Sequence, residues 1–87
     1  MLKNIFLYVI ILVMIGRYKD MLMKNVVSSS IRAIGYENGT LQVEFHSKGT
    51  FRYYNVPLYV YNELMAAPSL GGYFSQRIKS AFKGHKI

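Results

Sequence analysis

The clearest pattern in the chain is a strict alternation of apolar and polar residues over positions 41–46. Leu41, Val43 and Phe45 are apolar, and the residues between them are polar. Because successive side chains of a strand point to opposite faces, a period of two predicts a half-buried antiparallel strand.

Turn signals on both sides of this strand predict two neighbouring strands. Asn38-Gly39 is a strong hairpin signal because both residue types tolerate positive φ, and it follows a β-branched and aromatic run at 30–36. Ser47-Lys48-Gly49 makes a second turn before the aromatic run at 50–54. We therefore expect a three-stranded antiparallel meander.

Aromatic residues alternate along the third expected strand. Phe51 and Tyr53 share one face, while Arg52 and Tyr54 share the other. One pair should join the core, and Arg52 is placed to form a cross-strand ion pair with Glu44.

Two helices are expected after the strands. Pro57 suits the first turn of a helix, and Pro68 would stop that helix. Ser69 is a good N-cap for a second helix, and Gly84 is a candidate C-cap. The apolar positions follow helical spacing in both segments: Val60, Leu64 and Ala67 in the first; Phe74, Ile78, Ala81 and Phe82 in the second.

These elements predict an α+β domain over residues 23–87. It has a three-stranded antiparallel β-meander followed by two helices packed on one face (βββαα). A chain of 87 residues leaves room for a single small domain.

Residues 1–22 form an apolar N-terminal segment of different character. The uninterrupted run at 5–15 would rise only about 16 Å as a helix, which is about half of a bilayer core. A weak signal or membrane anchor is one interpretation. We favour a mis-assigned start, because Lys19-Asp20 can be encoded by a purine-rich ribosome-binding sequence just before Met23.

The charge balance is basic, with eleven Lys and Arg against four acids and a net charge of +7. No acid follows Glu63, whereas Arg77, Lys79, Lys83 and Lys86 do. A basic end favours an anionic partner such as nucleic acid, although a solvated helix face would look the same. The absence of cysteine fits a cytoplasmic protein.

Nucleic-acid binding needs cations for phosphate and flat side chains for base stacking. The candidate residues for such a surface come from the third strand and the second helix: Arg52, Tyr53, Tyr54, Tyr73, Arg77, Lys79 and Lys83. The competing structural interpretation is that the strand aromatics, Tyr53 included, belong to the core.

A tyrosine-rich protein–protein interface is the alternative function. The chain has eight tyrosines, more than a small core needs, and tyrosine is common at interfaces. Tyr59, Tyr61 and Tyr73 would line such a patch. Its binding should be insensitive to salt, whereas phosphate binding should weaken steeply.

An enzyme is not expected. Ser28-Ser29-Ser30 lacks a base and an acid partner, and His46 and His85 lack metal-ligand spacing. Gly71-Gly72 lacks the lysine of a phosphate-binding loop. We predict no catalytic residue, no metal and no cofactor.

The chain from about 26 to 82 resembles the KTSC domain, a segment at the C-terminus of some lysyl-tRNA synthetases that also occurs as small bacterial and phage proteins. The matching residues are spread over nearly the whole domain: Ser29, Ser30, Ile34, Gly35, Tyr36, Leu41, Val43, Phe45, Gly49, Phe51, Tyr53, Val56, Pro57, Val60, Tyr61, Ala67, Ser69, Gly71, Tyr73, Phe74 and Ile78. Phe51, Leu70 and Ser75 depart from the family's usual Tyr, Lys and Asn. The resemblance implies a domain for which RNA binding has been suggested from the synthetase context.

The sequence thus predicts a small, cytoplasmic, non-catalytic binding module. Its expected partner is RNA or another anionic molecule, or else a protein, and a membrane only if residues 1–22 are retained.

Overall fold

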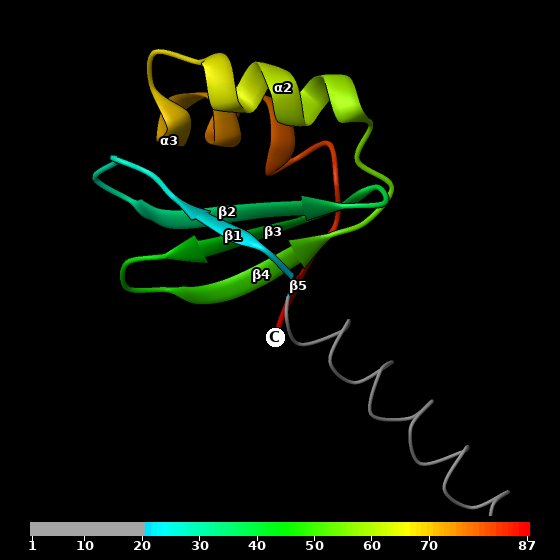
Figure 1. The fold of residues 1–87 in the computed structure, drawn as a ribbon, viewed down its shortest axis with the longest axis horizontal. Coiled ribbons are helices and arrows are strands. Elements are labelled where there is room, and N and C mark those ends of the chain that lie inside the picture. The colour runs from blue at the N-terminus through cyan, green and yellow to red at the C-terminus, as the bar shows by residue number, and fades with distance from the viewer. Residues whose placement is uncertain (1–20) are drawn as a thin grey trace, which may run out of the picture.

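A computed structural model describes residues 21–87, which form one antiparallel sheet covered by helices. The strands are β1 (Met23–Asn25), β2 (Ile31–Glu37), β3 (Thr40–Phe45), β4 (Gly49–Tyr53) and β5 (Gly84–Lys86). The helical segments are α2 (Leu58–Ala66), α3 (Leu70–Tyr73) and η1 (Phe74–Ile78). The three helical segments lie on the same side of the sheet and form one helical layer (Figure 1).

The central hairpins confirm the predicted meander. Asn38 and Gly39 have φ values of 50° and 81°, so both adopt the left-handed conformation that this turn requires. Glu37 pairs with Thr40 on either side of them. The second hairpin closes with Phe45 opposite Gly49, whose φ is 94°.

The sheet has five strands in the described part of the chain, so the prediction of three was incomplete. β1 pairs with β2, and β5 pairs with β4, at the two outer edges. Both added strands are three residues long, and every residue of β5 is exposed. Their pairing uses backbone groups and does not require a buried apolar face. The sequence therefore shows no alternation of apolar and polar residues at these positions.

The helical layer begins after Pro57, as predicted, and α2 buries Val60 and Leu64 against the sheet. Ser69 caps α3, because its side-chain oxygen accepts a hydrogen bond from the Gly72 amide at 3.1 Å. This confirms the predicted N-cap.

The second helix ends earlier than predicted. It widens into the π-helical turn η1, in which the Lys79 amide donates to the Phe74 carbonyl at 2.9 Å. Gly84 is therefore not a C-cap: it begins β5. Ala81, expected on the buried face, is exposed, whereas Phe82 packs against the core.

The core lies between the sheet and the helices. Its fully buried side chains come from β2, β3, the loop before α2, α2 and η1: Ile31, Ile34, Leu41, Val43, Val56, Leu64 and Ile78. Between residues 21 and 87, no helix has the length and apolar run that a membrane crossing requires. The interpretations of segment 1–22, a mis-assigned start or a weak signal or anchor, rest on residues 1–20, which lie outside the described residues.

Candidate nucleic-acid interface

Two adjoining hollows open where one end of the sheet meets α3 and η1. The first, here called the aromatic hollow, has a volume of about 200 Å³. It is lined by Ser30, Phe45, Lys48, Phe51, Tyr53, Gly71, Phe74, Ser75 and Lys79. The second, the serine hollow, has a volume of about 450 Å³ and is lined by Val27, Ser28, Ser29, Ser30, Pro68, Ser69, Leu70, Gly71, Gly72 and Ser75.

Four aromatic rings form the wall of the aromatic hollow, and they pack edge to face. Phe45 lies 5.8 Å from Phe51 and 5.3 Å from Phe74 between ring centroids, and Tyr53 lies 5.4 Å from Phe74. Tyr53 and Phe74 are buried, but Phe45 and Phe51 are only half-buried. The hollow therefore offers apolar ring surface that the core does not fully cover.

Two lysines flank these rings from different elements. Lys48 comes from the turn between β3 and β4, and Lys79 follows η1; both are exposed. Neither hollow is lined by a carboxylate. No acidic residue of either lining therefore offsets the positive charge of these two lysines.

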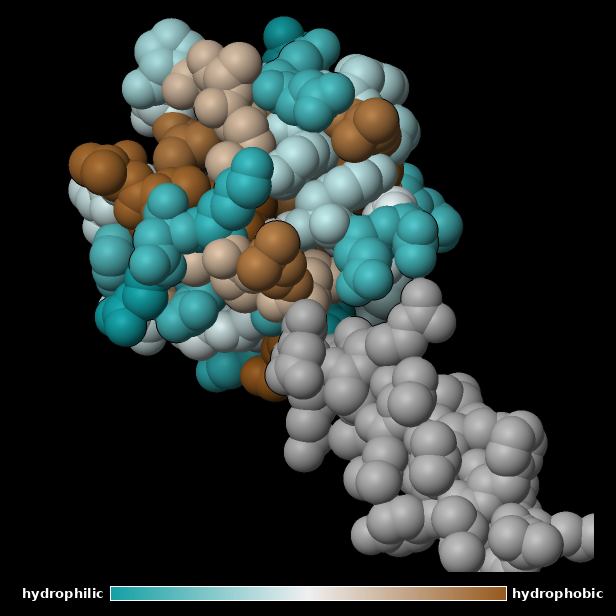
Figure 2. All heavy atoms as spheres, viewed as in Figure 1, coloured by the Kyte–Doolittle hydropathy of each residue, from teal (hydrophilic) through white to brown (hydrophobic). Residues whose placement is uncertain are grey.

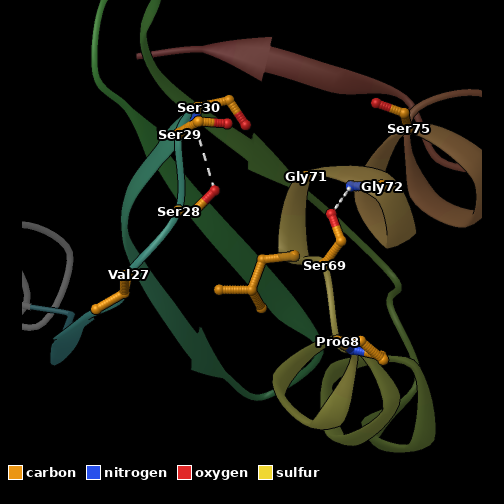
Figure 3. Close-up of a pocket in the computed structure, with 10 residues that line it drawn as sticks. Val27, Ser28, Ser29, Ser30, Pro68, Ser69, Gly71, Gly72 and Ser75 are labelled. Carbon is orange, nitrogen blue, oxygen red and sulfur yellow. Dashed lines mark hydrogen bonds between the residues drawn. The ribbon is translucent and has the colours of Figure 1, made fainter.

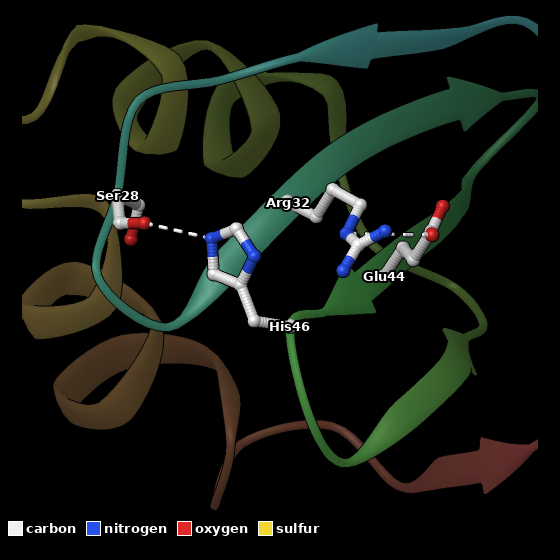
Figure 4. Close-up of polar contacts among 4 residues, drawn as sticks. All are labelled: Ser28, Arg32, Glu44 and His46. Carbon is white, nitrogen blue, oxygen red and sulfur yellow. Dashed lines mark hydrogen bonds and ion pairs between the residues drawn. The ribbon is translucent and has the colours of Figure 1, made fainter.

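The acidic side chains of the described residues lie away from both hollows. Glu44 lies 3.9 Å from the Arg32 guanidinium on β2 (Figure 4). Glu63 on α2 accepts a hydrogen bond from the Tyr73 hydroxyl at 2.7 Å. Glu37 is exposed beside the first hairpin turn.

The serine hollow lies between the β1–β2 connection and the start of α3 (Figure 3). Two of its serines accept hydrogen bonds from backbone amides. Ser28 Oγ accepts from the amides of Ser30 and Ile31 at 3.3 and 3.2 Å, and Ser69 Oγ caps α3. Within residues 21–87, the hydroxyls of Ser30 and Ser75 have no hydrogen-bond partner.

His46 holds the β1–β2 connection in place. Its Nε2 donates to the Ser28 carbonyl at 2.9 Å, since a carbonyl can only accept (Figure 4). Its backbone amide donates to the Ser30 carbonyl at 3.0 Å. The serine-bearing wall is therefore fixed to the end of β3.

The two hollows meet at Ser30, Gly71 and Ser75, which line both. A Cβ on Gly71 would lie 2.7 Å from Ser30 Oγ, closer than packed atoms allow. A larger residue at Gly71 would therefore force the Ser30 side chain out of its present position.

The structure brings two of the sequence-predicted residues, Tyr53 and Lys79, to the aromatic hollow. Arg52 lies on the opposite face of the sheet, is only 5% exposed, and donates from Nε to Gln42 Oε1 at 2.7 Å. The expected pairing of Arg52 with Glu44 was wrong, because the register sets Arg52 opposite Gln42 and Glu44 opposite Thr50.

The remaining predicted residues lie outside both hollows. Tyr54 is exposed, and its ring centroid lies 5.6 Å from that of His85. Burial, followed by the hydrogen bond to Glu63, raises the pKa of Tyr73. Arg77 and Lys83 are exposed and line neither hollow.

The three tyrosines of the alternative patch differ in exposure. Tyr59 is strongly exposed, at 63%, whereas Tyr61 and Tyr73 are half-buried. The Tyr61 ring stacks on Tyr36 at 4.8 Å, and the Tyr73 hydroxyl donates to Glu63. On the face shown in Figure 2, apolar residues among those described form separate clusters between hydrophilic ones.

Sequence reasoning did not select Lys48, Ser30 or Ser75 as site residues. Lys48 had a usable signal, since it lies in the turn that leads directly into the aromatic strand. The serines had none, because only the fold brings the β1–β2 connection against α3. No cluster of three His, Asp or Glu side chains suited to a metal ion occurs within residues 21–87.

Comparison with known proteins identifies the family. Residues 27–82 match the family model described as the KTSC domain. The chain belongs to the KTSC family. A crystal structure of a KTSC domain protein from Yersinia pestis superposes with a TM-score of 0.75 at 37% identity, covering 78% of this chain and 99% of that one.

Relatives of this KTSC domain occur in proteins of different size. A lysine–tRNA ligase of Nostoc sp. is 47% identical over 61 residues, which cover 68% of this chain but 11% of the ligase. The chain thus spans about a tenth of the ligase's length. A small protein of Stutzerimonas stutzeri is 46% identical over 54 residues, covering 60% of this chain and 76% of its relative.

Proposed function

We propose that this KTSC domain is a non-catalytic module that binds single-stranded RNA at the aromatic hollow. A base lies against the half-buried rings of Phe45 and Phe51, and flanking phosphates contact Lys48 and Lys79. The observation that carries the proposal is that two exposed lysines line an aromatic hollow without any acidic residue.

The two kinds of side chain supply the two energies that single-stranded binding needs. Base stacking on an aromatic ring contributes about 1–3 kcal/mol per base. Phosphate neutralisation adds a salt-dependent term for each cation. At about 200 Å³, the hollow is smaller than pockets for drug-sized ligands and suits one flat ring.

The family relationship also supports RNA binding. A related segment occurs in a protein named as a lysine–tRNA ligase, whose substrate is an RNA. An exposed cation outside the hollow, such as Arg77, would add long-range attraction for a polyanion. A cytoplasmic location, where cellular RNA is found, is part of the proposal.

The test is fluorescence anisotropy of a labelled, mixed-sequence single-stranded RNA titrated with the 87-residue chain at several salt concentrations. We expect Kd in about the micromolar range at low salt. Replacing Lys48→Ala and Lys79→Ala together should reduce the slope of log affinity against log salt by about 1.4, or about 0.7 per lost phosphate contact.

The matched control removes the same charge elsewhere. Lys24 on the edge strand β1 and Lys83 are exposed and line neither hollow. Lys24→Ala with Lys83→Ala should change affinity much less than the hollow variant. Equal loss in both variants would mean that only net charge matters, and no RNA binding at low salt would overturn the proposal in favour of a protein partner.

A further inference from the structure

We infer that the serine hollow holds the ribose next to the stacked base and contacts its 2′-hydroxyl, so that the domain prefers RNA to DNA. This inference rests on the proposed function, because it extends the same bound strand from one hollow into the next.

The two hollows are contiguous, which makes one ligand spanning both geometrically simple. Ser30, Gly71 and Ser75 line the aromatic hollow and the serine hollow alike. A base seated on Phe45 and Phe51 therefore has its sugar within reach of the Ser30 and Ser75 hydroxyls. In Figure 3 these two hydroxyls lie on the two sides of the space between the β1–β2 connection and the helix.

The chemistry of the serine hollow is that of a site for a neutral, hydroxylated group. Its lining contains no Lys, Arg, His, Asp or Glu, and half of its ten residues are serines. The cations are confined to the aromatic hollow, where Lys48 and Lys79 lie. The phosphate therefore belongs beside the rings, and the uncharged sugar belongs among the serines.

Ser30 and Ser75 are the serines that line both hollows, and their hydroxyls are open to a ligand. Ser28 and Ser69 accept hydrogen bonds from main-chain amides, whereas Ser30 and Ser75 have no partner within residues 21–87. A serine hydroxyl both donates and accepts, as does the ribose 2′-hydroxyl that distinguishes RNA from DNA.

The experiment compares labelled RNA with a DNA strand of the same sequence, with uracil in place of thymine so that only the 2′-hydroxyl differs. The 87-residue chain should bind the RNA about tenfold more tightly, which corresponds to one or two net hydrogen bonds. Ser30→Ala with Ser75→Ala should weaken RNA binding to the level of DNA and leave DNA binding unchanged.

The matched control is Ser47→Ala with Ser80→Ala, which removes two exposed hydroxyls that line neither hollow. It should keep the full RNA preference. Gly71→Ala tests the junction without removing a hydroxyl: its Cβ would crowd Ser30 Oγ, so the preference should also fall.

Each outcome separates the two claims. Equal binding of RNA and DNA that depends on Lys48 and Lys79 would overturn this inference and leave the proposed function standing. An RNA preference that survives in the Ser30 and Ser75 variant would also overturn it. Binding of neither strand would overturn both claims.

Discussion

The serine side chains around the serine hollow have different roles in the structure. Ser69 is tied to the start of α3 through its bond to the Gly72 amide, and Ser28 organises the turn before β2. Ser29 is exposed and makes no side-chain hydrogen bond within residues 21–87. Substitutions at these positions should therefore separate structural from binding effects.

We expect Ser69→Ala to lower the free energy of unfolding by about 1 kcal/mol, because the Gly72 amide loses its capping partner. Urea denaturation followed by circular dichroism measures this change. Ser29→Ala makes the same substitution without loss of a hydrogen bond and should change stability by less than about 0.5 kcal/mol. Equal effects of the two variants would show that the cap contributes nothing.

Residue placement within the candidate site was only partly predictable from the sequence. The alternation in β4 correctly put Phe51 and Tyr53 on one face and Arg52 on the other. Local pattern does not report which face is covered, so Arg52 was a candidate for the binding surface although it is buried. Lys48 and Ser30 join the site through contacts between distant segments, which local pattern does not contain.

At the scale of elements, the edge strand β5 depends on a small residue opposite a large one. Gly84 pairs with Tyr53 across the two strands, and the tyrosine ring lies over the glycine. A Cβ at Gly84 would collide with the ring carbons of Tyr53. The ring and the glycine thus fit as a pair.

We expect Gly84→Ala to lower the free energy of unfolding by about 1–3 kcal/mol, since Tyr53 is buried and has little room to move. Thermal or urea denaturation measures the loss. In a Tyr53→Leu background the same substitution should cost less, because the ring is gone. Equal cost in both backgrounds would place the strain somewhere other than this contact.

The elements that the sequence predicted are those with an apolar face. β2, β3, β4 and α2 each bury side chains. Their apolar and aromatic residues were visible in the sequence as alternation, helical spacing or a β-branched run. β1 and β5 are short edge strands whose pairing uses backbone groups, so composition gives no sign of them. The π-helical turn η1 likewise depends on hydrogen-bond spacing, because Phe74 and Ile78 fit an α-helical pattern equally well.

At the scale of the whole molecule, two tyrosines with raised pKa values make the stability depend on alkaline pH. Burial raises the pKa of Tyr53, and burial together with Glu63 raises that of Tyr73. Below about pH 10 both folded and unfolded chains keep these protons. Above it the unfolded chain ionises first, so the stabilisation is lost as pH rises through the folded pKa.

We therefore expect the urea midpoint to fall between about pH 9 and about pH 11. Tyr53→Phe should make that fall smaller, because the phenol that resists ionisation is gone. Tyr54→Phe, at an exposed position, is the matched control. A fall of the same size in the Tyr53 variant and the control would exclude Tyr53 as its source.

The strand order β1-β2-β3-β4-β5 has a consequence for how the chain folds. Every pairing up to β4 joins strands separated by a short connection, so these contacts can form early and locally. The pairing of β4 with β5 must wait until residues 54–83, including the whole helical layer, have been brought back to the sheet. β5 should accordingly be the last strand to form and the first to open, with the fastest amide hydrogen exchange in the sheet.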